Sequence, residues 1–254
     1  MAERHRADRA SLGLAVVYLA PLAVLVLRAA ADVWRAPAVW PQQLGSRGWS
    51  ALAAPQVLTA AGGSLLVAVV TTGVALPLAW GAARTIASRD TAARRWLLLA
   101  IALPLLVPPY AAGVGLGAWF ARWGLLDSHV ALVLAHLVFV LPYVVIVLAT
   151  GLGRRVDELE EAAAVLGARW SQRLRLVLVP AVCRPVAVAC LLGFVVSWSQ
   201  YGTSLAVGGG VPMLPLVLVP FVGADPQTAS ALAVAFLVPP LLALAVVAVA
   251  ARDR

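Results

Sequence analysis

The residues that could carry catalysis in this chain are few and widely separated. Ser64 follows two glycines, and His129 and His136 lie seven residues apart in one apolar segment. Such residues could supply the nucleophile and base of an intramembrane hydrolase. The chain lacks the G-x-S-x-G turn that exposes a nucleophilic serine in many hydrolases, and nothing in the sequence places either histidine beside a serine. We therefore expect no catalytic residue, and histidines that hydrogen-bond to neighbouring helices.

Nucleotide, cofactor and metal chemistry are disfavoured by composition. All 19 basic residues are arginine, which excludes a phosphate-binding G-x-x-x-x-G-K-[ST] loop and a lysine Schiff base. Cys183 and Cys190 share one apolar stretch, where small core residues are expected rather than a disulfide or a metal pair. The sequence predicts no cofactor and no metal site.

Residues 156–166 have the pattern of a helix with one small apolar face. Asp157 with Glu160 three residues later resembles a capping box, and carboxylates in the first turns suit the positive end of the helix dipole. The apolar positions follow the helical spacing i, i+3, i+4, i+7. They are Leu159, Ala162, Ala163 and Leu166.

A second short helix is expected directly after this one. Gly167 can end the first helix in a left-handed conformation, Ser171 can cap the second, and Pro180 is expected to break it. The result is an elbow whose small apolar face is suited to docking into a groove on another protein.

The elements around this elbow are membrane helices. Of 254 residues, 63% are hydrophobic and 12% charged, with a mean hydropathy of +0.95, which is too apolar for one soluble core. The sequence predicts an all-α, polytopic transmembrane bundle of about six helices in a single domain, 1–254. The expected spans are 11–30, 57–80, 96–118, 129–150, 181–200 and 228–250, with the elbow in a connection over 151–180.

Arginines set the expected orientation. Fifteen lie in the second and fourth connections and at the two ends of the chain, against three or four in the first, third and fifth connections. By the positive-inside rule both termini and the elbow are cytoplasmic. Arginines placed between apolar runs point to membrane lipid as a partner and not to nucleic acid.

Two features of the spans leave alternatives. The first span could be a signal peptide, because Arg28-Ala29-Ala30-Ala31 follows it, but its apolar run is longer than a signal core, so we expect a retained helix.

Prolines in four spans predict interrupted helices around a pathway, and Gly113 with Gly117 predicts a close helix–helix approach. A secondary transporter or channel is the alternative function, although acidic relay residues inside the spans are missing.

The elbow resembles the signature of ABC importer permeases, E-A-A-x₃-G-x₉-I-x-L-P. Glu161, Ala162, Ala163, Gly167 and Pro180 match it at the same spacing, while valines replace the isoleucine and leucine at 177 and 179. Residues 103–117 are also similar to that family's helix-breaking segment. The resemblance covers about half of the chain and implies a type I importer permease fold in a bacterial or archaeal inner membrane.

The resemblance also implies the partners. A cytoplasmic ATPase dimer would receive the coupling residues, among which we include Leu166, and would hydrolyse ATP, so this chain would not itself be an enzyme. A second permease half, identical or different, would complete the translocation path. An extracytoplasmic binding protein would deliver the cargo.

A polar break near the end of the fifth span is a candidate for the substrate path. It resembles the family's segment near the outer gate, especially in the branch that imports thiamine, ferric iron, polyamines or oxyanions. We expect its polar side chains to face the dimer interior or a solvent-filled mouth. The candidate residues are Trp198, Ser199, Gln200, Tyr201 and Thr203.

Overall fold

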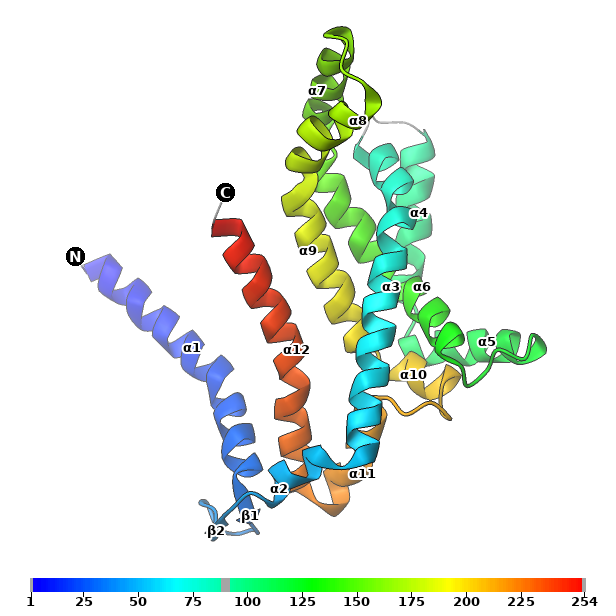
Figure 1. The fold of residues 1–254 in the computed structure, drawn as a ribbon. Helices are drawn as coiled ribbons and strands as arrows, with labels where there is room; N and C mark the ends of the chain where they lie inside the picture. Colours follow the sequence, from blue (N-terminus) through cyan, green and yellow to red (C-terminus); the bar gives the residue numbers. More distant parts are fainter. Residues whose placement is uncertain (1, 88–91, 253–254) are drawn as a thin grey trace. The chain divides into compact units, whose positions relative to one another are not determined.

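A computed structural model describes residues 2–87 and 92–252, and most of these residues are helical (Figure 1). This confirms the all-α prediction; strands in the described part of the chain are limited to the antiparallel pair β1 and β2. A 3₁₀ turn lies at Ala51–Ala53 and a π-helical turn at Leu174–Leu178. The elements are α1 (Ala2–Ala29), β1 (Ala31–Val33), β2 (Gln43–Leu44), α2 (Arg47–Ser50), α3 (Pro55–Ala87), α4 (Ala92–Leu106), α5 (Pro109–Arg122), α6 (His129–Gly151), α7 (Arg154–Val165), α8 (Trp170–Arg173), α9 (Val179–Trp198), α10 (Gly202–Val207), α11 (Leu214–Ala224) and α12 (Pro226–Arg252).

The chain forms two compact units. One combines Met1–Thr59 with Leu214–Pro239, and the other combines Ala60–Met213 with Pro240–Arg254. Helices α3 and α12 each contribute to both. The larger unit contains the elbow and the polar break, so both candidate sites belong to one body.

Fewer helices meet the requirements of a straight membrane span than the six expected. Among the described residues four are long and apolar enough, at Pro55–Ala87, His129–Gly151, Trp170–Trp198 and Pro226–Ala250, and a bent pair makes up to five. In the first expected span, the apolar part of α1 is the shorter helix Gly13–Ala29.

The third expected span, 96–118, is not one straight helix. Helices α4 and α5 meet at 100° across a short break. Pro108 lies in that break with extended backbone (φ −56°, ψ 131°), because a residue that precedes a proline is driven out of the helical region, and Pro109 follows it. Pro109 then begins α5, where its missing N–H is harmless.

The other prolines do not interrupt their helices, which corrects the prediction of breaks in four spans. Pro77 lies inside α3 and Pro142 inside α6, and α12 continues through Pro239 and Pro240. A proline in a membrane helix removes one hydrogen bond, and neighbouring helices and local adjustment of the turn can compensate.

The core of the larger unit is built around α6 and α9, which run side by side (Figure 1). Val140, Val144 and Leu148 of α6 are buried in one cluster with three alanines of α3. These alanines, Ala75, Ala79 and Ala83, are spaced four residues apart and are fully buried. Small side chains on one helical face let a neighbouring helix approach closely.

Glycines on α5 allow the close approach of α10, as the G-x-x-x-G spacing predicts. A Cβ at Gly113 would lie 2.8 Å from the Cβ of Ala206, and one at Gly117 would lie 3.0 Å from the Ala206 carbonyl oxygen. A Cβ at Gly115, between them, would meet open space. The two outer glycines therefore face α10 and the central one does not.

Gly113→Val is expected to destabilise the larger unit by about 1–3 kcal/mol, the usual penalty for overpacking. Thermal unfolding of the purified chain in detergent measures the loss. Gly115→Val is the matched control, since it makes the same change on the same helix without a clash, and equal losses in the two variants would contradict this packing.

Candidate functional site

Helix α7 and the turn after it form the predicted elbow. Gly167 has a φ of +80°, its N–H donates to the Ala164 carbonyl, and the N–H of Ala168 donates to the Ala163 carbonyl. These two hydrogen bonds define a Schellman motif, in which a residue in the left-handed conformation ends the helix. The prediction that Gly167 ends this helix in a left-handed conformation is therefore confirmed.

Both helix starts in the elbow differ from the sequence-based expectation. Helix α7 begins at Arg154 after Gly153, so Asp157 lies in its first turn and is not its cap. The short helix α8 begins after Arg169, whose N–H donates to the Gln172 side chain, so Ser171 is not the cap either. In both cases the helix begins earlier in the sequence than expected.

Pro180 does not break the helix that follows. The chain remains helical from Trp170 to Trp198, through a π-helical turn at Leu174–Leu178 and into α9. An α-helical turn would press the proline ring against the carbonyl four residues earlier, and the wider π turn relieves that contact.

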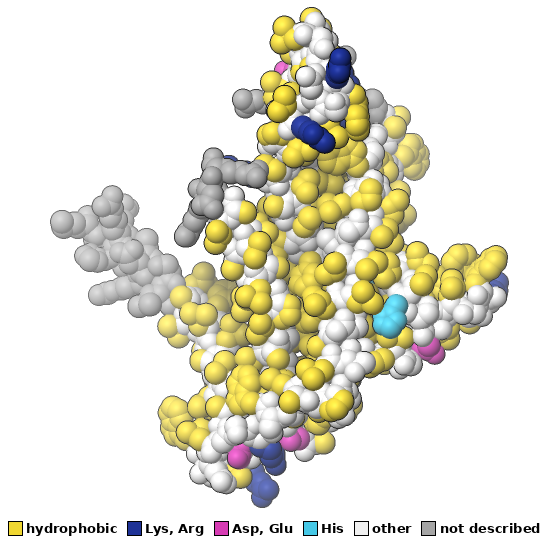
Figure 2. All heavy atoms as spheres, viewed as in Figure 1, with side chains coloured by type: hydrophobic (Ala, Val, Ile, Leu, Met, Phe, Trp, Pro, Cys, Tyr) yellow, Lys and Arg dark blue, Asp and Glu magenta, His cyan; other side chains and the backbone are white. Residues whose placement is uncertain are grey.

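The far end of α7 is an exposed apolar surface. Val165 and Leu166 are each 87% exposed, and Glu161, Ala162 and Gly167 are also exposed, while Ala163 is half-buried. Figure 2 shows hydrophobic and Arg side chains together at the end of the unit that carries α7 and α8. Among the predicted coupling residues, Pro180 lies apart from this tip, at the start of α9.

An ion pair that sequence analysis missed braces α7 against α3. Arg84, in the last turns of α3, hydrogen-bonds to the carboxylate of Glu160, and its Nη2 lies 4.0 Å from the Asp157 carboxylate. The pair is partly exposed, so its energy is modest, but it joins α7 to the end of α3. The sequence signal for this ion pair was a basic residue near a helix end, and that signal does not indicate which carboxylate the residue contacts.

The five residues predicted for the substrate path are divided between buried and exposed positions. Trp198, Gln200 and Thr203 are buried, and Thr203 donates a hydrogen bond to the Gln200 side chain. Ser199 is exposed and Tyr201 is 40% exposed. They join α9 to α10, and their contact with cargo stays a prediction.

His136 connects three helices, as expected for a histidine that hydrogen-bonds to neighbouring helices, and its partners are two serines that the sequence alone did not place beside it. It is fully buried on α6, and its two ring nitrogens lie 2.9 Å from Ser197 Oγ of α9 and 3.0 Å from Ser204 Oγ of α10. The Ser204 hydroxyl donates to the Gln200 carbonyl, so Nε2 of His136 must donate and Nδ1 accepts from Ser197. All three side chains are enclosed, and the network is structural.

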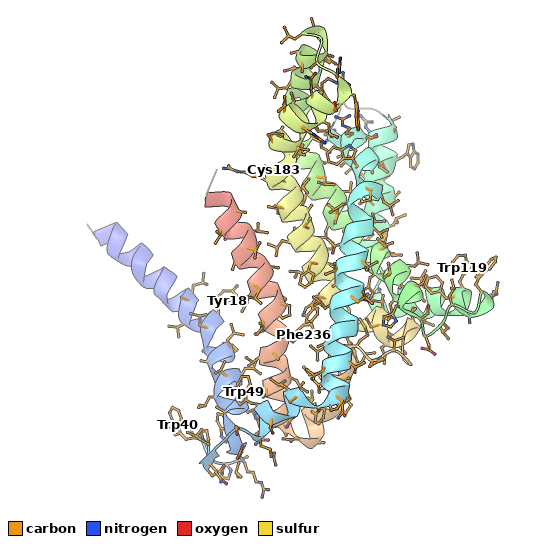
Figure 3. All side chains as sticks on the ribbon, in the orientation of Figure 1. Tyr18, Trp40, Trp49, Trp119, Cys183 and Phe236 are labelled. Atoms are coloured by element: carbon orange, nitrogen blue, oxygen red, sulfur yellow. The ribbon has the colours of Figure 1, made fainter. Side chains whose placement is uncertain are left out.

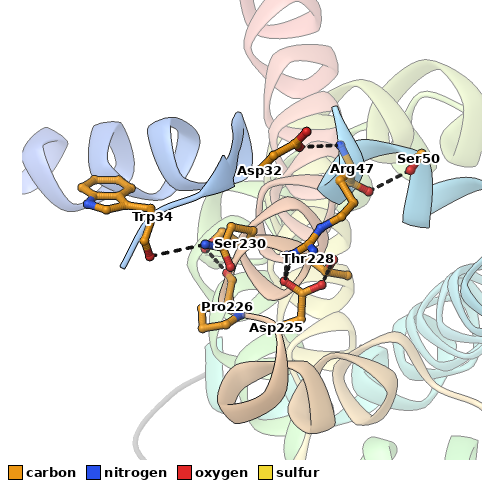
Figure 4. A network of polar contacts seen from close by, with 9 residues as sticks. Asp32, Trp34, Arg47, Ser50, Asp225, Pro226, Thr228 and Ser230 are labelled. Carbon is orange, nitrogen blue, oxygen red and sulfur yellow. Dashed lines mark hydrogen bonds and ion pairs between the residues drawn. The ribbon is translucent and has the colours of Figure 1, made fainter. Parts of the chain in front are cut away.

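A separate polar network stabilises the smaller unit (Figure 4). Arg47 of α2 donates from its backbone N–H to Asp32 and from Nη2 to Asp225, at 3.0 and 2.9 Å. Thr228 Oγ1 donates to the second oxygen of Asp225 at 2.7 Å. Burial alone would raise the pKa of Asp225, but the hydrogen bonds from Thr228 and the charge of Arg47 outweigh it and hold that pKa below the usual 3.8.

The lowered pKa of Asp225 predicts a pH dependence of stability. The network stabilises the fold above the unfolded-state pKa near 4, and this contribution disappears as the pH falls through the lower folded-state pKa. Asp225→Asn should therefore lower the unfolding temperature at pH 7, and the difference from the original chain should shrink below pH 4. A difference that stays constant with pH would contradict this assignment.

Comparison with known proteins places this geometry in a family context. Residues 73–254 match the family described as binding-protein-dependent transport system inner membrane component. An ABC transporter permease of Streptomyces antibioticus (ORF1) is 35% identical over 181 residues, 68% of this chain and 76% of that protein. The molybdenum transport system permease protein ModB of Mycobacterium tuberculosis is 31% identical over 261 residues, 93% of each chain. The trehalose transport system permease protein SugB of the same species is 26% identical over 164 residues, 64% of this chain and 60% of that one.

Proposed function

The chain belongs to the family of binding-protein-dependent transport system inner membrane components, the permeases of ABC importers, and we propose that α7 couples it to a separate cytoplasmic ATPase. The observation that carries this proposal is the exposed tip of α7, where Val165 and Leu166 are 87% exposed beside the Gly167 turn. An apolar surface of this kind is unfavourable when it is exposed to water, and a groove on a partner protein would cover it. The Arg84–Glu160 brace then transmits motion of α7 to α3.

A second permease half, identical or different, completes the pathway in this proposal. Many side chains along the membrane helices are apolar and exposed in the single chain, including those of α12 from Leu241 to Val249. Lipid and a second bundle are the surroundings that such faces fit.

Cargo selection is assigned to an extracytoplasmic binding protein. No arginine, aspartate or glutamate lies between Phe194 and Gly223, so the segment around Ser199 and Tyr201 offers hydrogen bonds but no fixed charge. The relatives carry different named cargoes, molybdenum for ModB and trehalose for SugB, which favours a common, weakly selective path.

In this proposal both termini and the elbow are cytoplasmic, which the arginine distribution supports. Two exposed positions test this arrangement. Leu166, at the tip of α7, is 87% exposed, and Val39, in the connection between β1 and β2, is 79% exposed, so differences in labelling between them would report the side of the membrane and not burial.

The experiment uses Leu166→Cys and Val39→Cys, each with Cys183→Ser and Cys190→Ser. A membrane-impermeant maleimide should label position 39 in spheroplasts and position 166 in inside-out membrane vesicles. In those vesicles a short thiol–amine crosslinker should join position 166 to an ATPase. Labelling of position 166 from outside, or no crosslink to an ATPase, would overturn the coupling proposal.

A further inference from the structure

A pocket of about 630 Å³ lies at the base of the elbow, away from the exposed tip of α7. Its walls come from the end of α3, from α7 and α8, and from the π-helical turn and first half of α9. Cys183, labelled in Figure 3, marks the wall that α9 contributes. All of these elements belong to the larger unit.

The charges in this pocket leave one cation uncompensated. Arg84, Arg173 and Glu160 line it, and Arg84 is already paired with Glu160 and near Asp157. In the described part of the chain no carboxylate lies within ion-pair distance of Arg173, and its buried Nε has no acceptor. A half-buried guanidinium without a partner is unfavourable and strongly favours an anion.

The rest of the lining is apolar and continues along a membrane helix. Leu178 and Val182 form a buried floor, while Val179 is 52% exposed. Trp80 and Trp170 lie at the rim on α3 and α8, and tryptophans favour the headgroup level of a bilayer. The pocket thus offers one cation at a headgroup level and an apolar wall leading from it along α9.

We propose that this pocket binds a membrane phospholipid, whose phosphate pairs with the terminal nitrogens of Arg173 and whose acyl chains lie along α9. A phosphodiester carries one negative charge, which matches the uncompensated charge of Arg173. A soluble phosphate compound would leave the apolar wall exposed to water, and for that reason the lipid is the occupant. This site is independent of ATPase docking, because the docking surface is the tip of α7 and Arg173 is not part of it.

Native mass spectrometry of the full chain, purified from membranes in mild detergent with its associated subunits and then delipidated, tests the site. Dioctanoyl phosphatidylglycerol and dioctanoyl phosphatidylethanolamine are titrated in separate arms, and at least one should bind at one saturable site per chain. Arg173→Ala should weaken that binding about tenfold, as expected for loss of a charge-assisted contact.

Arg175→Ala is the matched control. Arg175 lies two residues further along, is exposed, and does not line the pocket, so its removal changes the net charge equally and should leave the affinity within about twofold. Equal weakening in both variants, or no saturable site, would overturn the proposal.

Two further ligands separate the lipid from its parts. Glycerol 3-phosphate carries the phosphate without the chains, and dioctanoylglycerol carries the chains without the phosphate. Both should bind at least tenfold more weakly than the phospholipid. Comparable binding of glycerol 3-phosphate would identify a soluble-anion site, and comparable binding of dioctanoylglycerol would show that Arg173 plays no part; either result would overturn the proposal.

Discussion

Gly167→Val is expected to reduce ATP-driven uptake roughly tenfold or more while the chain still reaches the membrane. Gly167 has a φ of +80° in the Schellman turn, a region that a β-branched residue enters only with strain of about 1–3 kcal/mol. No atom lies within 4 Å of the position a Cβ would take, so the effect comes from the backbone and not from a clash. The turn would reopen, and the exposed end of α7 would lose its direction toward the ATPase.

Two variants make this result specific. Gly153→Val changes the glycine at the other end of α7, where the backbone is extended (φ −77°, ψ 172°) and a Cβ has open space, and uptake should persist. Gly167→Asn should recover much of the activity, because asparagine tolerates the left-handed region. Uptake and membrane content are measured in the same cells, and full uptake by Gly167→Val would remove the case for α7 as the coupling element.

His136→Ala is expected to lower the free energy of unfolding by about 3 kcal/mol or more. The change leaves a cavity among α6, α9 and α10, and it removes the hydrogen-bond partner of two enclosed serine hydroxyls, Ser197 and Ser204. Cavities and buried unpaired polar groups are among the most destabilising changes in protein cores. The unfolding temperature and the yield of monodisperse protein report the loss.

His129→Ala provides the comparison on the same helix. His129 is exposed at the start of α6, so its removal should change stability by less than about 0.5 kcal/mol. His136→Gln retains one donor and one acceptor and should lose less stability than His136→Ala. If alanine at positions 136 and 129 had equal effects, the buried network would not be a stabilising feature of this fold.

Much of this protein follows from short-range properties of its sequence. Hydropathy over about 20 residues predicts six membrane helices, because the lipid imposes the same requirement on every span; in the described part of the chain four straight helices and one bent pair are long and apolar enough. The turn at Gly167 could also be predicted from the sequence, since a glycine after an amphipathic helix is the least strained residue for a left-handed cap. The bend between α4 and α5 could be predicted only in part. The prolines at 108 and 109 indicate a break, but the 100° angle depends on how the two helices pack.

Only the tertiary structure decided which distant side chains meet. Arg84 and Glu160 are 76 residues apart, and His136 is 61 and 68 residues from its two serines. The polar break at 197–204 therefore suggested a path for cargo from the sequence alone, whereas part of it is buried against His136 in the structure. The physical reason is that hydropathy and backbone conformation belong to a segment, while ion pairs, buried hydrogen bonds and pockets depend on the crossing of helices, which the small faces of α3, α5 and α10 permit.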